Sequence, residues 1–136
     1  MAKICFYGDD FTGASDNAAQ YFRYGLKTLL FFSDPGEALL EQAAQEFDVV
    51  GIAGTARSLA TDQMASEVLP ILQRFRQLGS PIIQYKCCST FDSTAKVGSL
   101  GEAIHLMKSC WPDSFVPVLA AAPEFGRYTM LSLIHI

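Results

Sequence analysis

Five short apolar runs recur along the chain, and this repetition constrains its fold more than any other feature. The runs are Lys3–Tyr7, Leu26–Phe32, Asp48–Ala53, Pro81–Cys87 and Phe115–Ala121. Continuous hydrophobicity without alternation is typical of parallel strands that are covered on both faces. The segments between them have helical character: Gly13–Tyr24, Glu37–Glu46, Thr61–Leu78 and Val97–Cys110. The alternation predicts a three-layer α/β fold of the Rossmann or flavodoxin-like kind, an open, mainly parallel sheet of about five strands with helices on both faces.

The third helical segment is the clearest, because apolar residues recur in it at steps of three and four. Thr61 or Asp62 is expected to cap its start and Gly79 its end. Pro70 lies inside the segment and predicts a kink or a later start, since proline cannot donate the backbone hydrogen bond of a helix interior.

Composition supports one globular domain and excludes several classes of protein. Of the 136 residues, 50% are hydrophobic and 18% charged, which excludes a disordered or collagen-like chain. A net charge of -4 gives no general attraction to nucleic acid. No apolar run approaches the roughly 20 residues of a membrane span, and two early aspartates interrupt any signal peptide, so a cytoplasmic protein without a membrane partner is expected. The four cysteines lack metal-site spacing, which predicts reduced thiols and no bound metal.

The residues that follow the first run are unusually polar. Ligands of open α/β sheets bind at the carboxyl ends of the strands, so these loops are the first candidates for a site. Asp9 and Asp10 leave the first run, and Thr12 and Gly13 open the next helix, whose free N–H groups attract anions. The alternative is that Asp10 or Thr12 only caps the helix.

Polar and charged side chains also follow the later runs. Arg57 follows the third run, and a guanidinium there is suited to a carboxylate or a phosphate, although a solvated surface arginine is the alternative. The loop after the fourth run contains Lys86, Ser89, Thr90, Asp92 and Ser93. Turn formation alone accounts for hydroxyls and a carboxylate, but a lysine ending a buried strand needs a nearby anion. Arg127 follows the fifth run, with Glu124 as its expected partner. This convergence predicts a site for a polar ligand.

Several familiar signatures are absent from the sequence. There is no GxxxxGK[ST] phosphate loop, no GxGxxG after the first run and no GxSxG elbow. His105 and His135 are interpreted as surface or half-buried residues rather than catalysts. The ordinary nucleotide-binding and hydrolase interpretations therefore find no support.

Three motifs in order resemble the N-terminal domain of the four-carbon acid sugar kinase family. They are GDDFTGASDNAAQ from residue 8, YKCCSTFDST from residue 85 and APEFGR from residue 122. The resemblance implies a two-domain kinase that phosphorylates threonate, erythronate or an oxo-acid relative. It implies that this α/β domain holds the sugar acid, whereas a C-terminal domain, expected to be missing here, holds ATP with Mg²⁺. Cys87 and Cys88 replace a lysine and an aspartate of many members, and CSTFDS resembles a branch associated with oxo acids.

The resemblance also implies roles for individual residues. The substrate-binding set is Asp9, Thr12, Gly13, Arg57, Lys86, Ser89, Thr90, Ser93 and Arg127. Phosphoryl transfer needs a carboxylate near the accepting hydroxyl, and we assign this role to Asp10, with Asp92 as the alternative. Arg57 and Lys86 are expected to hold the substrate carboxylate, and Arg127 either that group or the transferred phosphate.

Residues 1–129 are expected to form the substrate-binding domain, and residues 130–136 an atypical tail, because MLSLIHI is apolar where the family continues with polar sequence. This chain is then expected to bind a sugar acid without turnover and to self-associate through uncovered apolar area. Two alternatives stay open: a non-catalytic sugar-acid-binding or structural domain, and a phospho-accepting receiver. The receiver requires an aspartate after the third strand, where this chain has GTARS.

Overall fold

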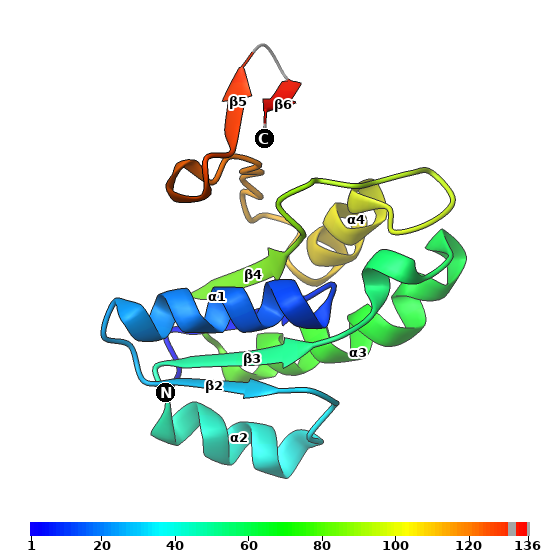
Figure 1. The fold of residues 1–136 in the computed structure, drawn as a ribbon. Coiled ribbons are helices and arrows are strands. Elements are labelled where there is room, and N and C mark those ends of the chain that lie inside the picture. Colours follow the sequence, from blue (N-terminus) through cyan, green and yellow to red (C-terminus); the bar gives the residue numbers. More distant parts are fainter. Residues whose placement is uncertain (131–132, 136) are drawn as a thin grey trace.

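A four-stranded parallel sheet forms the centre of the molecule (Figure 1). The computed structural model describes residues 1–130 and 133–135. The strands are β1 (Ile4–Gly8), β2 (Thr28–Phe31), β3 (Val49–Ala53) and β4 (Ile82–Lys86). Their order across the sheet is β2-β3-β1-β4, and all neighbouring pairs are parallel. The expected α/β class is confirmed, and the sequence placed each of these four strands within two residues of its ends.

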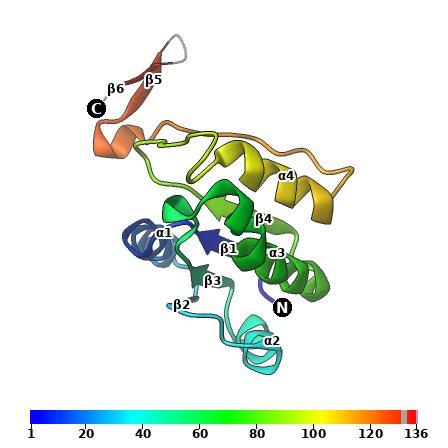
Figure 2. The same cartoon turned by 90° about the vertical axis from the view of Figure 1, so that its right-hand side faces the viewer.

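Helices cover both faces of the sheet (Figure 2). They are α1 (Phe11–Arg23), α2 (Glu37–Glu46), α3 (Thr61–Leu78) and α4 (Leu100–Cys110), with short 3₁₀ turns η1 (Ala56–Ser58) and η2 (Pro123–Phe125). On one face Phe6 and Val49 pack with Ala14 of α1. On the other face Cys5 and Tyr7 belong to a larger core that α2, α3 and α4 complete. The three-layer arrangement follows from side chains that alternate between the faces along each strand.

The central strands are buried almost throughout, as parallel strands require. Every residue of β3 is buried, and Gly51 lies opposite Phe6 in the register of β1 and β3. A Cβ atom at position 51 would lie 2.2 Å from the Phe6 ring. Glycine is therefore needed here because the aromatic ring occupies the space of its missing side chain.

The third helix agrees with its predicted bounds but not with its predicted start signal. Gly79 ends α3 in the left-handed conformation, with φ 69°, which confirms the C-cap. The N-cap prediction was wrong, since Ala60 occupies that position and the Thr61 hydroxyl donates to the Ala95 carbonyl at 3.0 Å instead. The helix also runs through Pro70 rather than beginning after it.

The expected fifth strand does not form. Residues 115–121 have no regular secondary structure, and Pro117 removes a backbone donor from the middle of the run. The chain instead continues into a separate antiparallel pair, β5 (Tyr128–Met130) and β6 (Leu133–His135), which projects away from the sheet in Figure 1. Residues 131, 132 and 136 of the expected tail lie outside the described residues.

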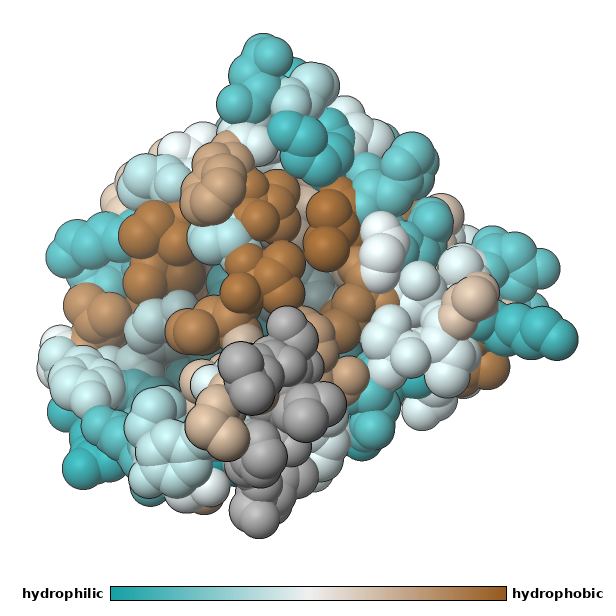
Figure 3. Space-filling view, turned by 90° about the horizontal axis from the view of Figure 1, so that it is seen from above, coloured by the Kyte–Doolittle hydropathy of each residue, from teal (hydrophilic) through white to brown (hydrophobic). Residues whose placement is uncertain are grey.

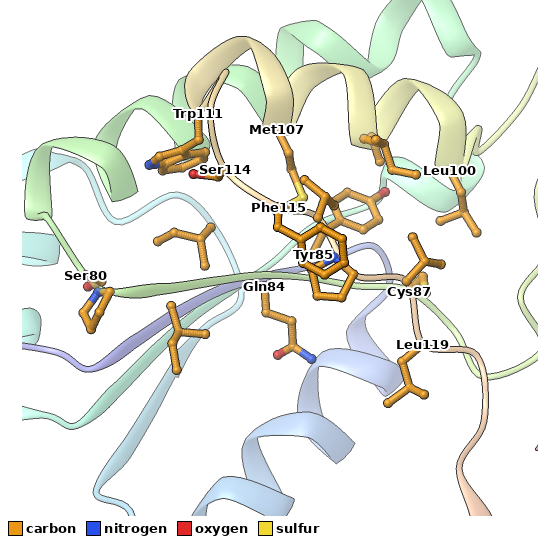
Figure 4. A pocket seen from close by; sticks show the side chains of 18 of the residues that line it. Ser80, Gln84, Tyr85, Cys87, Leu100, Met107, Trp111, Ser114, Phe115 and Leu119 are labelled. Carbon is orange, nitrogen blue, oxygen red and sulfur yellow. The ribbon is translucent and has the colours of Figure 1, made fainter.

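An apolar cavity of about 510 Å³ lies beside β4, where a fifth strand was expected. Met107 of α4, Phe115 and Leu119 line it, as Figure 4 shows, and Gln84, which also lines it, points toward α1. Phe115 is 88% exposed and Leu119 81%. Apolar side chains also gather on the face seen in Figure 3. In the strand order of the described residues β4 is an edge strand, so these apolar side chains lie beside an edge without a strand partner.

Two further expectations concern the cysteines and the membrane. All four cysteines are free thiols, and Cys5 and Cys110 are buried. Within the part of the chain that the structure describes, no helix has both the length and the hydrophobicity to cross a membrane.

Candidate functional site

The carboxyl ends of three strands meet at one edge of the sheet. Gly8 at the end of β1 lies in register with Ala53 of β3 and Lys86 of β4. The loops that follow therefore start side by side, although they are far apart in sequence. They carry most of the polar residues that the sequence analysis selected, and we call Asp9, Asp10, Arg57, Lys86 and Asp92 the charged cluster.

Arg57 connects the three loops of the charged cluster. Its Nη1 donates to Asp10 Oδ2 at 2.8 Å, and its Nη2 donates to Asp92 Oδ2 at 2.5 Å. The same Nη2 lies 3.4 Å from Thr90 Oγ1. The bonds to Asp10 and then Asp92 raise the pKa of the guanidinium above its usual range. Arg57 keeps a third of its side chain exposed, so it can also meet a ligand from solvent.

Asp10 has a structural role in addition to its ion pair. It is the N-cap of α1, where its Oδ1 accepts from the Gly13 N–H at 2.5 Å. The capping alternative is therefore correct, and the second oxygen of the same carboxylate binds Arg57. Both oxygens of Asp10 are engaged, and its contact with a substrate hydroxyl stays a prediction.

Asp9 is the unusual carboxylate of the cluster. It is only 4% exposed, and its Oδ1 has no hydrogen-bond partner among the described residues. Burial, followed by the neighbouring charge of Asp10, raises the Asp9 pKa to about 6, although Lys86 and Arg57 act in the opposite direction. A buried carboxylate oxygen without a partner is costly, and the contact of Asp9 with a substrate stays a prediction.

Lys86 extends from the end of β4 toward the start of α1. Its Nζ donates to the Cys87 carbonyl at 2.5 Å. A Cβ atom at position 13 would lie 2.8 Å from Asp10 Oδ1 and 3.7 Å from Lys86 Nζ. Gly13 therefore keeps space free between a cation and the N-terminus of a helix, both of which attract an anion.

The loop after β4 has its own internal contacts. Thr90 Oγ1 donates to Asp92 Oδ2 at 2.6 Å and lies 3.3 Å from Cys88 Sγ. These bonds, from Thr90 and then Arg57, lower the Asp92 pKa. Burial acts to raise the pKa of the Cys88 thiol, but the Thr90 contacts and Arg57 outweigh it and lower the pKa. The loop thus presents negative charge to Arg57.

Some expected site residues lie apart from the cluster. Ser93 Oγ accepts from the Leu100 N–H at 2.9 Å, at the start of α4. Thr12 is exposed in the first turn of α1, and neither it nor Ser89 makes a side-chain hydrogen bond in the described residues. Their contacts with a substrate stay predictions.

Arg127 lies near the other end of α1, away from Asp10. Glu124, three residues earlier, accepts from the Tyr24 hydroxyl at 3.2 Å and lies 3.8 Å from Arg23. The expected pair of Glu124 with Arg127 was therefore wrong. Because the fifth strand does not form, its end does not carry Arg127 to the sheet edge, and a substrate role for Arg127 remains a prediction without a supporting contact.

Sequence reasoning missed two residues beneath the cluster, Tyr7 and Glu67. The Tyr7 hydroxyl donates to Glu67, which also accepts from Thr55 in the loop before Arg57. The sequence contained an indication of a buried polar contact for each residue. Glu67 lies three residues after Met64 and four before Ile71, both on the buried stripe of α3, and a tyrosine in a buried strand needs a partner for its hydroxyl.

The charged cluster does not form a metal site by itself. Among the described residues, no group of three or more His, Cys, Asp and Glu side chains is placed to hold a metal ion. The cavity beside β4 is likewise a separate feature, because its lining includes none of the five cluster residues.

Comparison with known proteins identifies what the chain is similar to. The family model for a sugar-binding N-terminal domain matches residues 4–135. A 3-oxo-isoapionate kinase of Paraburkholderia graminis is 39% identical over 93% of this chain and 27% of its own length. A 3-oxo-tetronate kinase of Pseudomonas fluorescens is 36% identical over 88% of the chain and 27% of its own length. These matches confirm the resemblance that the motifs indicated, and the chain spans little more than a quarter of either relative.

Solved structures agree with the fold. A Haemophilus influenzae protein covers 96% of this chain with a TM-score of 0.84 and 28% identity, over 30% of its own length. A Bordetella bronchiseptica domain, described as a domain-swapped dimer with bound citrate, covers 98% of the chain with a TM-score of 0.79 and 26% identity, over 32% of its own length.

Proposed function

The chain belongs to the family of sugar-binding N-terminal domains, and from this premise we propose that its charged cluster binds a four-carbon sugar acid. The observation that carries the proposal is the position of Arg57, which faces two carboxylates across the sheet edge. Its neighbour Asp9 has a buried Oδ1 without a hydrogen-bond partner in the part of the chain that the structure describes. A cation and a free acceptor next to each other suit a ligand that combines a carboxylate with hydroxyl groups.

We further propose that the complete protein is an ATP-dependent kinase for a 3-oxo sugar acid such as a 3-oxo-tetronate. The names of both curated relatives support this reaction. ATP and Mg²⁺ are then bound by the part of those relatives that this chain does not match. The 136-residue chain binds the acid without turnover, and we assign the protein to the cytoplasm.

Within this proposal Arg57 and Lys86 hold the substrate carboxylate. The incoming carboxylate replaces Asp92 rather than Asp10, because the Asp92 side chain is 62% exposed and the Asp10 side chain 24%. Exposed ion pairs contribute little stability, so exchanging one costs little. Asp10, with Asp92 as the alternative, then orients the accepting hydroxyl, since proximity of a carboxylate to that hydroxyl is what phosphoryl transfer requires.

Calorimetric titration of the chain with erythronate, with and without ATP, tests the proposal. We expect binding without ADP formation, and an affinity at least about tenfold lower in Arg57→Ala, because a charge-assisted hydrogen bond is lost. Arg76→Ala is the matched control, since Arg76 is an exposed arginine on α3. Equal affinity in the two variants would contradict the assignment of Arg57. Absence of binding of both erythronate and a 3-oxo-tetronate by the unmodified chain would favour a structural domain.

We also propose that the chain self-associates. The exposed apolar residues beside β4, Phe115 and Leu119, support this, and so does the description of the Bordetella domain as a domain-swapped dimer. An apolar edge without a strand partner favours contact with another molecule.

A further inference from the structure

We propose that Tyr7 and Glu67 are positioning residues, which hold the loop after β3 so that the Arg57 guanidinium faces Asp10 and Asp92. This inference rests on the proposed function in one respect: the ligand whose affinity Tyr7 and Glu67 influence is the sugar acid. Neither residue contacts the ligand in this proposal. Glu67 acts through Thr55 and Tyr7 through Ala56, the two residues that immediately precede Arg57.

Four hydrogen bonds connect the two residues to this loop and to each other. Glu67 Oε1 accepts from the Tyr7 hydroxyl and, at 2.7 Å, from the Thr55 N–H. Glu67 Oε2 accepts from Thr55 Oγ1 at 2.7 Å. The Ala56 N–H donates to the Tyr7 hydroxyl oxygen at 3.2 Å. Both carboxylate oxygens of Glu67 and the Tyr7 hydroxyl thus bind two successive loop residues, Thr55 and Ala56.

The surroundings make this arrangement rigid. Tyr7 is fully buried in β1, and Glu67 extends from α3, the helix packed below it. A Cβ atom at position 54 would lie 2.2 Å from the Tyr7 hydroxyl oxygen and 2.3 Å from Glu67 Oε1. The glycine therefore lets the loop backbone lie directly against the pair. The bond from Ala56 to Tyr7 is buried, whereas the two bonds from Thr55 to Glu67 lie at the surface, so the network holds the loop from the core outward.

The protonation states agree with these roles. Burial and then Glu67 raise the Tyr7 pKa, so the phenol stays a donor. Burial acts to raise the Glu67 pKa, but the bonds from Tyr7 and Thr55 outweigh it and lower the pKa. Glu67 is therefore an ionised acceptor at neutral pH, which strengthens its hydrogen bonds.

The loop residues that Tyr7 and Glu67 hold are directly followed by Arg57, which is also bonded to the sheet. On the side of the sheet, the Gly54 N–H donates to the Gly8 carbonyl at 2.8 Å and the Arg57 N–H to the Asp9 carbonyl at 3.1 Å. On the side of α3, Glu67 and Tyr7 hold the residues between them. The short η1 turn is therefore fixed from both sides, and the Arg57 side chain starts from a defined position opposite the two carboxylates.

Erythronate titration of Glu67→Gln and Tyr7→Phe tests the inference, with Glu41→Gln as a control that makes the same change at an exposed position of α2. We expect roughly a tenfold loss of affinity in Glu67→Gln and a smaller loss in Tyr7→Phe, with no loss in Glu41→Gln. In an Arg57→Ala background, Glu67→Gln should cause no further loss, because both changes remove the same interaction. Additive losses would overturn the inference, since a merely structural effect does not depend on Arg57.

A measurement without ligand separates this inference from the proposed function. We expect the Arg57 side-chain N–H signals, observed by NMR, to be protected from exchange in the unmodified chain and to lose protection in Glu67→Gln. Unchanged protection would overturn the inference whether or not erythronate binds. If Glu67→Gln does not fold, Tyr7→Phe is judged by the same two readouts, and failure of the unmodified chain to bind erythronate counts only against the proposed function.

Discussion

Replacing the buried carboxylate of Asp9 by an amide should stabilise the protein at neutral pH. The Asp9 pKa is about 6 in the folded protein, against an ordinary value of 3.8 that also describes the unfolded chain. The difference is about 2 units, and each unit corresponds to about 1.36 kcal/mol. The ionised carboxylate therefore lowers the free energy of unfolding by about 3 kcal/mol, and Asp9→Asn removes this penalty.

The effect has a defined dependence on pH. Between about pH 4 and pH 6 the folded state binds more protons at Asp9 than the unfolded state, so stability falls as the pH rises through this window. Below about pH 4 Asp9 is neutral in both the folded and the unfolded state, so its ionisation does not lower the stability. Above about pH 6 Asp9 is ionised in both states, and the loss of stability is constant. The groups that act on Asp9 are Asp10, Lys86 and Arg57, and Asp9→Asn leaves all three in place.

Urea unfolding followed by circular dichroism measures the difference directly. We expect Asp9→Asn to be about 2–3 kcal/mol more stable than the unmodified chain at pH 7.5, and nearly equal to it at pH 4, with unchanged denaturant slopes. Asp16→Asn, an exposed position on α1, is the control and should change little at either pH. A variant that is less stable at pH 7.5, or a difference that does not depend on pH, would refute the reasoning.

Two further predictions concern packing and association. Gly51→Ala should lose roughly 1–3 kcal/mol of unfolding free energy, because its Cβ would lie 2.2 Å from the Phe6 ring. Gly101→Ala in α4 should gain about 0.5–1 kcal/mol, because outside its own helix backbone and chain neighbours its Cβ would meet only Ser99 Oγ, at 3.6 Å; equal effects in urea titrations would contradict the packing argument. Leu119→Lys should lower the average mass measured by light scattering at high protein concentration, since it places a charge beside the open edge of β4. Lys27→Leu, at an exposed position before β2, should not lower this mass, and an unchanged mass in Leu119→Lys would exclude the surface beside β4 as the site of association.

Hydrophobic pattern predicted most of the fold because burial on both faces leaves a direct record in sequence. The bounds of α2 and α3 agree with the prediction, and the strands differ by at most two residues at each end. The failure at 115–121 has a physical reason. An apolar run becomes a strand only when a neighbour supplies hydrogen bonds, and Pro117 cannot donate one.

The gathering of charged side chains at one sheet edge was predicted, but only some of the contacts among them. The carboxyl ends of parallel strands share an edge, so Asp10, Arg57 and Asp92 could be expected to lie close together. That Arg57 joins the other two depends on side-chain geometry, which no spacing rule describes. The place of Glu67 on the buried stripe of α3 indicates that its carboxylate needs a partner, but not which one, because Tyr7 and Thr55 lie on different elements.

The identity of Asp9 is better explained by a ligand than by the fold. Its backbone does structural work, since its N–H donates to the Lys86 carbonyl at 3.0 Å and its carbonyl accepts from Arg57 at 3.1 Å, but any residue other than proline could make both bonds. Its side chain has an oxygen without a partner and carries a penalty of about 3 kcal/mol, a large part of the 5–15 kcal/mol that stabilises a typical domain. An amide or an alanine would avoid that penalty at the same place in the fold. The fold therefore gives no reason for a charge at this position, and this agrees with the proposal that Asp9 serves the binding of the sugar acid.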